Sequence, residues 1–141
     1  LYRHRAKRLY KLGEDIRRRG GNIPGNSNEL RDSGFIGLYV TNAFELFILR
    51  NRKPLLDVNM SRLLKRYFKP GDFIDVRYDK EIQELANDII EVRRCKELNW
   101  AILDYAALVC KTRNPLCGEC VLNKHCKYYE LSQGDVTEEP E

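Results

Sequence analysis

The spacing of four cysteines constrains this chain more than any other feature of its sequence. Cys110, Cys117, Cys120 and Cys126 form the pattern C-x6-C-x2-C-x5-C, while Cys95 stands alone. Disulfide bonds require an oxidising compartment, and no secretory signal peptide is recognisable in the sequence. Thiolates this close together favour a metal centre, and the spacing alone admits either zinc or an iron–sulfur cluster.

The charge of the chain is distributed unevenly. Lys and Arg number 25 against 21 Asp and Glu, but residues 130–141 hold five acids and no base. Residues 1–129 therefore carry 25 basic and 16 acidic side chains, a net charge of +9. A basic body suggests a polyanion as partner, most simply a nucleic acid, although an ordinary soluble surface would also account for it.

Composition and periodicity together predict an all-α fold. The chain is 43% hydrophobic and 33% charged, which is typical of neither a membrane-embedded nor a compositionally disordered protein. No pair of strands with a hairpin turn stands out, whereas apolar residues recur at helical spacing. The segments with this spacing are 2–16, 38–49, 60–67, 82–90 and 98–109. In the second of them, we expect Val40, Phe44 and Phe47 to point inward.

Three features follow one another along the chain: a glycine-containing helical turn near residue 35, an Asp at the start of a helix, and the cysteine pattern after the helix of Trp100. In this order they resemble the helix-hairpin-helix DNA glycosylases of the endonuclease III/MutY superfamily, over residues 1–129. The resemblance implies a partial helical barrel over 1–97, with the hairpin at about 28–49. A helix and cluster loop over 98–129 and a disordered acidic tail at 130–141 would follow.

The resemblance also bears on the extent of the chain. Its first residue is Leu1 rather than Met, and the barrel of the family begins upstream of the segment that this residue opens. We therefore expect a fragment, the C-terminal two-thirds of a glycosylase.

In this family the cysteine pattern is the signature of a 4Fe-4S cluster. The resemblance therefore favours the cluster over zinc, with Cys110, Cys117, Cys120 and Cys126 as its ligands and a scaffolding rather than catalytic role. The loop between the first two ligands contacts DNA phosphates in the family. Lys111 and Arg113 would make these contacts here.

The hairpin segment, residues 28–41, resembles the family pattern L-x-x-L-P-G-V-G-x-x-T-A. Gly37 aligns with its second glycine, while residues 33–35 depart from the pattern as Ser, Gly and Phe. A glycine turn before a helix N-terminus exposes backbone N–H groups that can bind phosphates. We therefore expect Ile36 and Gly37 to bind DNA.

Tyr39 occupies the position at which lyase members of the family carry a lysine. A lysine amine can attack C1′ of the sugar and cut the strand by β-elimination, which a phenol cannot do. Tyrosine here is similar to Mig-type thymine–guanine mismatch glycosylases and to some adenine glycosylases, which are monofunctional. The competing interpretation is a partly buried aromatic side chain on a helix.

Asp57 lies within a segment, residues 55–62, that resembles the family's V-D-x-N-V-x-R. The Asp of that motif is the catalytic carboxylate, and a carboxylate stabilises the oxocarbenium-like sugar that forms when a glycosidic bond breaks. The competing interpretation is that Asp57 only caps the helix that follows it, and both roles can hold together.

The resemblance predicts a monofunctional DNA glycosylase that removes thymine or uracil opposite guanine from duplex DNA. Two alternatives remain, an adenine glycosylase acting opposite guanine or 8-oxoguanine and a DNA-binding fragment without catalysis. The expected partner is double-stranded DNA with a mismatched or damaged base, and no membrane. We expect a monomer, or a chain paired with the missing N-terminal segment, in the prokaryotic cytoplasm or the nucleus and not secreted.

Overall fold

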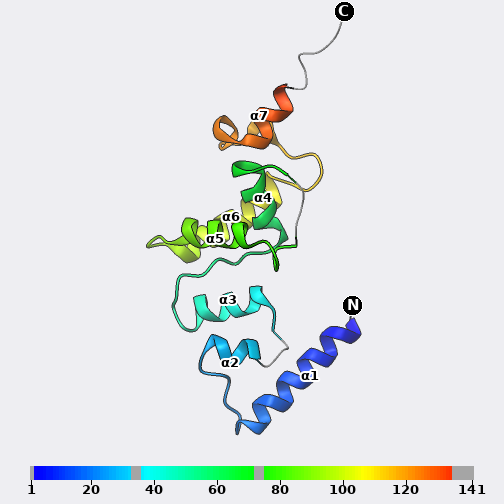
Figure 1. Ribbon diagram of the computed structural model, residues 1–141, viewed down its shortest axis with the longest axis vertical. Helices are drawn as coiled ribbons and strands as arrows, with labels where there is room; N and C mark the ends of the chain where they lie inside the picture. The colour runs from blue at the N-terminus through cyan, green and yellow to red at the C-terminus, as the bar shows by residue number, and fades with distance from the viewer. Residues whose placement is uncertain (1, 33–35, 72–74, 135–141) are drawn as a thin grey trace, which may run out of the picture. The chain divides into compact units, whose positions relative to one another are not determined.

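Helices make up the structure, as the periodicity predicts. The computed structural model describes residues 2–32, 36–71 and 75–134, and these ranges contain α-helices and 3-10 turns and no strand. The chain divides into two units, Leu1–Lys53 and Pro54–Glu141, which are described separately (Figure 1). None of the described helices is long and apolar enough to cross a lipid bilayer. The predicted all-α class is confirmed.

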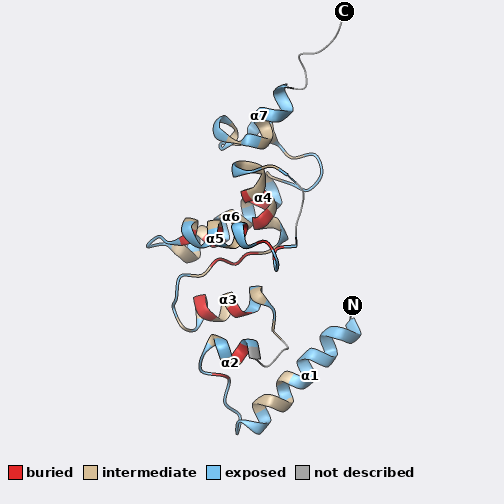
Figure 2. Ribbon diagram, viewed as in Figure 1, coloured by how far each residue is buried: buried red, intermediate tan, exposed pale blue. Residues whose placement is uncertain are grey.

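The first unit contains three α-helices: α1 (Tyr2–Arg18), α2 (Ser27–Asp32) and α3 (Leu38–Phe47). Helix α1 ends where Gly20 and Gly21 adopt positive φ angles of 68° and 90°, a conformation that side chains with a Cβ rarely adopt. Helices α2 and α3 pack against each other. No residue of α1 is buried, and Figure 2 shows this helix in pale blue and tan without red.

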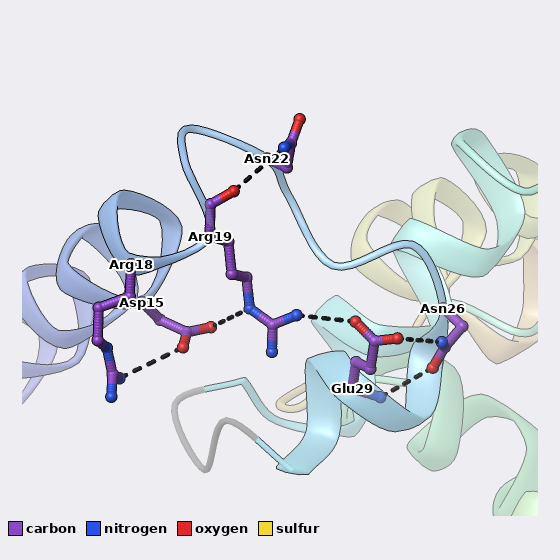
Figure 3. Close-up of polar contacts among 6 residues, drawn as sticks. All are labelled: Asp15, Arg18, Arg19, Asn22, Asn26 and Glu29. Carbon is purple, nitrogen blue, oxygen red and sulfur yellow. Dashed lines mark hydrogen bonds and ion pairs between the residues drawn. The ribbon is translucent and has the colours of Figure 1, made fainter.

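A polar cluster joins the end of α1 to the start of α2 (Figure 3). Arg19 donates from Nε to Asp15 at 2.9 Å and from Nη1 to Glu29 at 2.8 Å. The Asn26 side chain accepts from the backbone N–H of Glu29 at 2.9 Å and donates to the Glu29 carboxylate at 2.6 Å. This reciprocal pair caps the short helix α2 in the manner of a capping box.

The buried face of α3 differs from the predicted one. Val40 is 50% exposed, and the buried residues of the helix are Thr41, Glu45 and Leu46. Hydrogen bonds from Asn51 and then from Ser27 lower the pKa of Glu45. The face of α3 that is buried thus carries Thr41, Glu45 and Leu46, and α2, which packs against α3, supplies Ser27 as a polar partner for Glu45. The prediction for Val40 is wrong.

The second unit is arranged around α4 (Val58–Phe68), which contacts α5, α6 and α7. The other elements are α5 (Lys80–Ile90), α6 (Cys95–Leu108), the 3-10 turns η1 (Cys117–Glu119) and η2 (Asn123–His125), and α7 (Lys127–Gly134). The buried apolar side chains of this unit are Leu55, Leu56, Met60, Leu63, Leu64, Val76, Ile82, Ala86, Ile90 and Ala106. Most of them come from α4, α5 and the segment before α4.

The C-terminal region differs in part from the predicted disordered tail. Residues 130–134 belong to α7, which contacts α4 and carries an ion pair of 2.9 Å between Lys127 and Glu130 in its first turn. Residues 135–141 of the predicted tail lie outside the described residues. The division predicted at residue 97 falls within α6.

Candidate functional site

Asp57 stands at the N-terminus of α4, directly after a buried segment. Its carboxylate oxygen Oδ1 accepts hydrogen bonds from the backbone N–H groups of Asn59 and Met60, both at 2.8 Å. Asp57 therefore caps the helix, as its position in the sequence predicts. The side chain is half-buried.

A buried asparagine holds the chain in front of Asp57. Asn99 of α6 is 0% exposed, and its Oδ1 accepts from the backbone N–H of Leu55 at 2.6 Å. Its Nδ2 donates to the carbonyl of Cys95 at 2.8 Å. No sequence motif predicts this role for Asn99. The signal for it is a polar residue next to the apolar positions of an amphipathic helix.

Hydrogen bonds run from Asp57 to the first cysteine of the pattern. Asn59 Nδ2 donates to Asp57 Oδ2 at 2.9 Å, and Arg62 Nη1 donates to Asn59 Oδ1 at 3.0 Å. Arg62 also donates to two carbonyls near the end of α6, from Nε to Cys110 at 2.9 Å and from Nη2 to Ala106 at 2.7 Å. The half-buried guanidinium thereby ties the start of α4 to the chain at Cys110. Asn59 and Arg62 lie in the segment 55–62 that resembles the family motif around Asp57, but the sequence alone predicts no role for them.

The four cysteines of the pattern line one cavity together with residues of α4 and α7. None of them forms a disulfide, and all are half-buried. Burial raises the pKa of the Cys117 thiol, and the neighbouring thiolates of Cys110, Cys126 and Cys120 raise it further. Among the described residues, no three Cys, His, Asp or Glu side chains form a group that could hold a metal ion. Cys95 is half-buried and does not line this cavity.

The loop after Cys110 is held from α4 by Arg66. Arg66 Nη1 donates to the carbonyl of Lys111 at 2.7 Å and approaches Cys110 Sγ at 3.5 Å, while Nη2 donates to the carbonyl of Thr112 at 3.2 Å. Its guanidinium carbon lies 4.7 Å from the centre of the Tyr128 ring. The side chains of Lys111 and Arg113 are exposed. The loop thus presents two cations from a backbone that is fixed by hydrogen bonds.

The predicted hairpin residues belong to the first unit. Gly37 precedes α3 with φ of −86° and ψ of 173°, and its carbonyl accepts from the backbone N–H of Thr41 at 3.0 Å. Gly37 has no side chain to cap α3, so within the part of the chain that the structure describes, N–H groups of the first turn are left for another acceptor. Ile36 is half-buried and Tyr39 is 42% exposed. Residues 33–35, where the sequence departs from the family pattern, lie outside the described residues.

The structure therefore groups most of the predicted site residues in the second unit. Asp57, the four cysteines, Lys111 and Arg113 all lie there, within residues 54–141. Ile36, Gly37 and Tyr39 lie in the first unit, within residues 1–53. The hydrogen bonds of Arg62 and Arg66 join the catalytic candidate to the cysteine region inside one unit.

Known proteins with similar sequences are DNA glycosylases. The thymine/uracil-DNA glycosylase of Methanothermobacter thermautotrophicus is 30% identical over 132 residues, which are 92% of this chain and 59% of that protein. The thymine-DNA glycosylase of Aeropyrum pernix is 35% identical over 129 residues, 89% of this chain and 58% of that protein. An endonuclease III and three adenine DNA glycosylases match at 24 to 28% identity. No family model matches.

The fold agrees with these sequences. The solved structure of a thermostable thymine-DNA glycosylase superposes with a TM-score of 0.77 at 29% identity, covering 89% of this chain and 58% of that one. The chain is therefore homologous to part of the helix-hairpin-helix DNA glycosylases, in sequence and in fold. It spans less than two thirds of the length of the thymine and thymine/uracil-DNA glycosylases that it matches. Helices α2 and α3 fall on the segment predicted as the hairpin, about residues 28–49.

Proposed function

We propose that this chain is part of a DNA glycosylase that hydrolyses the N-glycosidic bond of thymine or uracil opposite guanine. The observation that carries the proposal is the Asp57 carboxylate, held at the start of α4 by two backbone N–H groups and by Asn59. A fixed carboxylate stabilises positive charge on the sugar without having to reorganise during the reaction. The thymine and uracil specificity of the relatives supports the choice of base.

The proposed reaction stops at base removal. Tyr39 stands where a lyase would carry lysine, and its phenol cannot form a Schiff base with C1′ of the sugar. The side chain is 42% exposed on α3, so it is accessible to a substrate. We therefore expect abasic sites that are cut only after treatment with alkali.

Double-stranded DNA is the proposed partner. The proposed location is the cytoplasm or the nucleus, where such DNA is found. The uncapped start of α3, behind Ile36 and Gly37, offers backbone N–H groups to phosphates. Lys111 and Arg113 offer exposed cations on a loop that Arg66 fixes. Since phosphate contacts release counterions, binding should weaken steeply as the salt concentration rises.

A 4Fe-4S cluster is the proposed cofactor, held by Cys110, Cys117, Cys120 and Cys126. All four line one cavity, and none of them forms a disulfide. Four cysteine thiolates are the usual ligand set of such a cluster. Four thiolates are a complete ligand set, so the cluster would act as a scaffold for the 111–116 loop.

The glycosylase proposal is tested on duplexes with T·G, U·G or A·8-oxoguanine pairs, with and without alkali. We expect alkali-dependent cleavage of the T·G and U·G duplexes. Asp57→Asn should reduce the rate of base removal by about 100-fold or more, the usual contribution of a catalytic carboxylate. Asparagine caps helices as well as aspartate does, so the stability of the variant should change little.

The matched control is Asp88→Asn, the same change at an exposed position of α5, which should leave the rate unchanged. If Asp57→Asn retains full activity, Asp57 is only a helix cap. Cleavage of the A·8-oxoguanine duplex alone would point to the adenine glycosylases that also match this chain. If the protein binds DNA but removes no base from any of the duplexes, the interpretation as a DNA-binding fragment without catalysis would be favoured.

The cofactor is tested separately on purified protein. We expect a yellow-brown colour and equal amounts of iron and acid-labile sulfide, lost together when Cys117 is replaced by serine. Cys95→Ser is the control, because this half-buried thiol does not line the cavity. Colourless protein with one zinc ion per chain would contradict the proposal.

A further inference from the structure

Tyr105 of α6 contacts one of the four cysteine sulfurs directly. Its hydroxyl oxygen lies 3.2 Å from Cys120 Sγ, and the same oxygen accepts a hydrogen bond from the backbone N–H of Val121 at 3.0 Å. The side chain is half-buried. In the sequence, Tyr105 is one of the apolar positions of its helix, and only the structure shows its contact with Cys120.

The direction of the hydrogen bond follows from the partners. A thiolate that binds iron has no proton to donate, so Cys120 Sγ can only accept. The backbone N–H of Val121 can only donate, and it occupies the acceptor side of the phenol oxygen. The hydroxyl proton of Tyr105 is therefore left to point at the sulfur.

Of the described side chains that reach a sulfur of the four cysteines, Tyr105 is the clearest hydrogen-bond donor. Arg66 also reaches a sulfur, Cys110 Sγ at 3.5 Å, but its guanidinium holds the carbonyls of Lys111 and Thr112 as well. The described contacts of the Tyr105 hydroxyl are confined to Cys120 and Val121. Removal of this hydroxyl therefore removes the sulfur contact and one hydrogen bond from the backbone N–H of the exposed residue Val121.

We propose that the Tyr105 hydroxyl donates a hydrogen bond to the Cys120 thiolate and thereby raises the reduction potential of the cluster that the four cysteines hold. Reduction adds one electron and places more negative charge on the ligand sulfurs. A hydrogen-bond donor to such a sulfur stabilises the reduced form more than the oxidised form. The proton stays on Tyr105, and no covalent bond forms or breaks. The inference rests on the proposed cofactor.

The test is the midpoint potential of the one-electron couple, measured on an electrode with the full chain. Tyr105→Phe should shift the reduction equilibrium about fivefold toward the oxidised form, the magnitude expected for one hydrogen bond. For a one-electron couple this equals about 40 mV to more negative potential, since a tenfold change is 59 mV. The control is Tyr129→Phe, because Tyr129 lines the same cavity and no contact between its hydroxyl and a sulfur is described. This variant should keep the wild-type potential.

A second measurement does not depend on the stability of the Tyr105 variant. Replacement of all tyrosines by 3-fluorotyrosine keeps their shape and makes each phenol a stronger donor, so the potential should move to more positive values. The same shift should occur in a Tyr129→Phe background.

Three results would overturn the inference. If Tyr105→Phe retains iron, sulfide and the wild-type potential, only the role of Tyr105 is wrong and the cofactor stands. An unchanged potential in the fluorotyrosine protein leads to the same conclusion. If wild-type protein contains no iron or sulfide, the cofactor proposal fails and the role of Tyr105 fails with it.

Discussion

Helices α1 and α4 have similar sequence patterns but very different environments. Both are amphipathic, yet α1 of the first unit has no buried residue whereas α4 of the second unit buries Met60, Ser61, Leu63 and Leu64. Leu9 in the apolar stripe of α1 is 69% exposed, and Met60 is 0% exposed. The difference shows that an apolar stripe predicts a helix and the face available for packing, while burial depends on whether other elements cover that face.

The largest expected difference between the two helices is in core packing. Met60→Ala should lower the free energy of unfolding by about 2–5 kcal/mol, because it removes a buried side chain and leaves a cavity. Leu9→Ala should change it by no more than about 0.5 kcal/mol, since the side chain is exposed. Urea denaturation followed by Trp100 fluorescence measures the first effect, and far-UV circular dichroism measures both. Equal effects would show that α1 is packed in solution.

The next effect concerns a buried ion pair of the second unit. Lys65 Nζ lies 2.6 Å from Asp79 Oδ2, and this hydrogen bond from Lys65 is the main cause that lowers the pKa of Asp79. Asp79→Asn keeps a residue that can cap α5 but removes the charge, so it should cost about 1.5–3 kcal/mol near neutral pH. Asp88→Asn on the exposed face of α5 is the control.

The direction of the pKa shift of Asp79 determines how the ion pair's contribution to stability depends on pH. Since the pKa of Asp79 is lower in the folded chain, the ion pair contributes its full stability above the pKa of the unfolded chain, about 3.9. That contribution is lost as the pH falls through the lower, folded pKa. The stabilities of wild type and Asp79→Asn should therefore converge in acid, and a constant difference at all pH values would refute a role for the charge.

A smaller effect is expected from the buried asparagine in front of Asp57. Asn99→Leu leaves the backbone N–H of Leu55 without its acceptor and should cost about 1–3 kcal/mol in urea denaturation. Asn87→Leu is the matched control, because Asn87 lies exposed on α5 and its side chain donates to the carbonyl of Gln83 in the same helix. If Asn99 also positions Asp57, the rate of base removal should fall with the first variant and not with the second.

The smallest effect is expected in the polar cluster of the first unit. Arg19→Gln removes the ion pairs with Asp15 and Glu29, but these groups are in contact with solvent. Global stability should hardly change, and amide hydrogen exchange in α2 should become faster because the start of the helix is held less firmly. The acceleration should shrink at high salt, which screens the ion pairs in the wild type. A large loss of global stability would mean that the polar cluster contributes more to the stability of the first unit than its solvent exposure indicates.

Much of the site could be predicted because its elements are local in the sequence. Asp57 caps α4 through N–H groups two and three residues away, a pattern that can be found without a fold. The cysteine spacing likewise pointed to one cavity, which all four line. The catalytic role of Asp57, the DNA contacts and the cluster ligands stay predictions. By contrast, Asn99 meets Leu55 across 44 residues and Arg62 meets Cys110 across 48, and no local pattern indicates such pairs.

The sequence by itself determined the helices, the cap at Asp57 and the grouping of four thiols, because each depends on spacings of a few residues. Only the tertiary structure decided that α3 buries Thr41 and Glu45 rather than Val40, and that the Tyr105 hydroxyl meets a cysteine sulfur. These outcomes depend on which distant segment supplies a partner. The free energy of such a contact is shared among many packed side chains, so short patterns do not encode it.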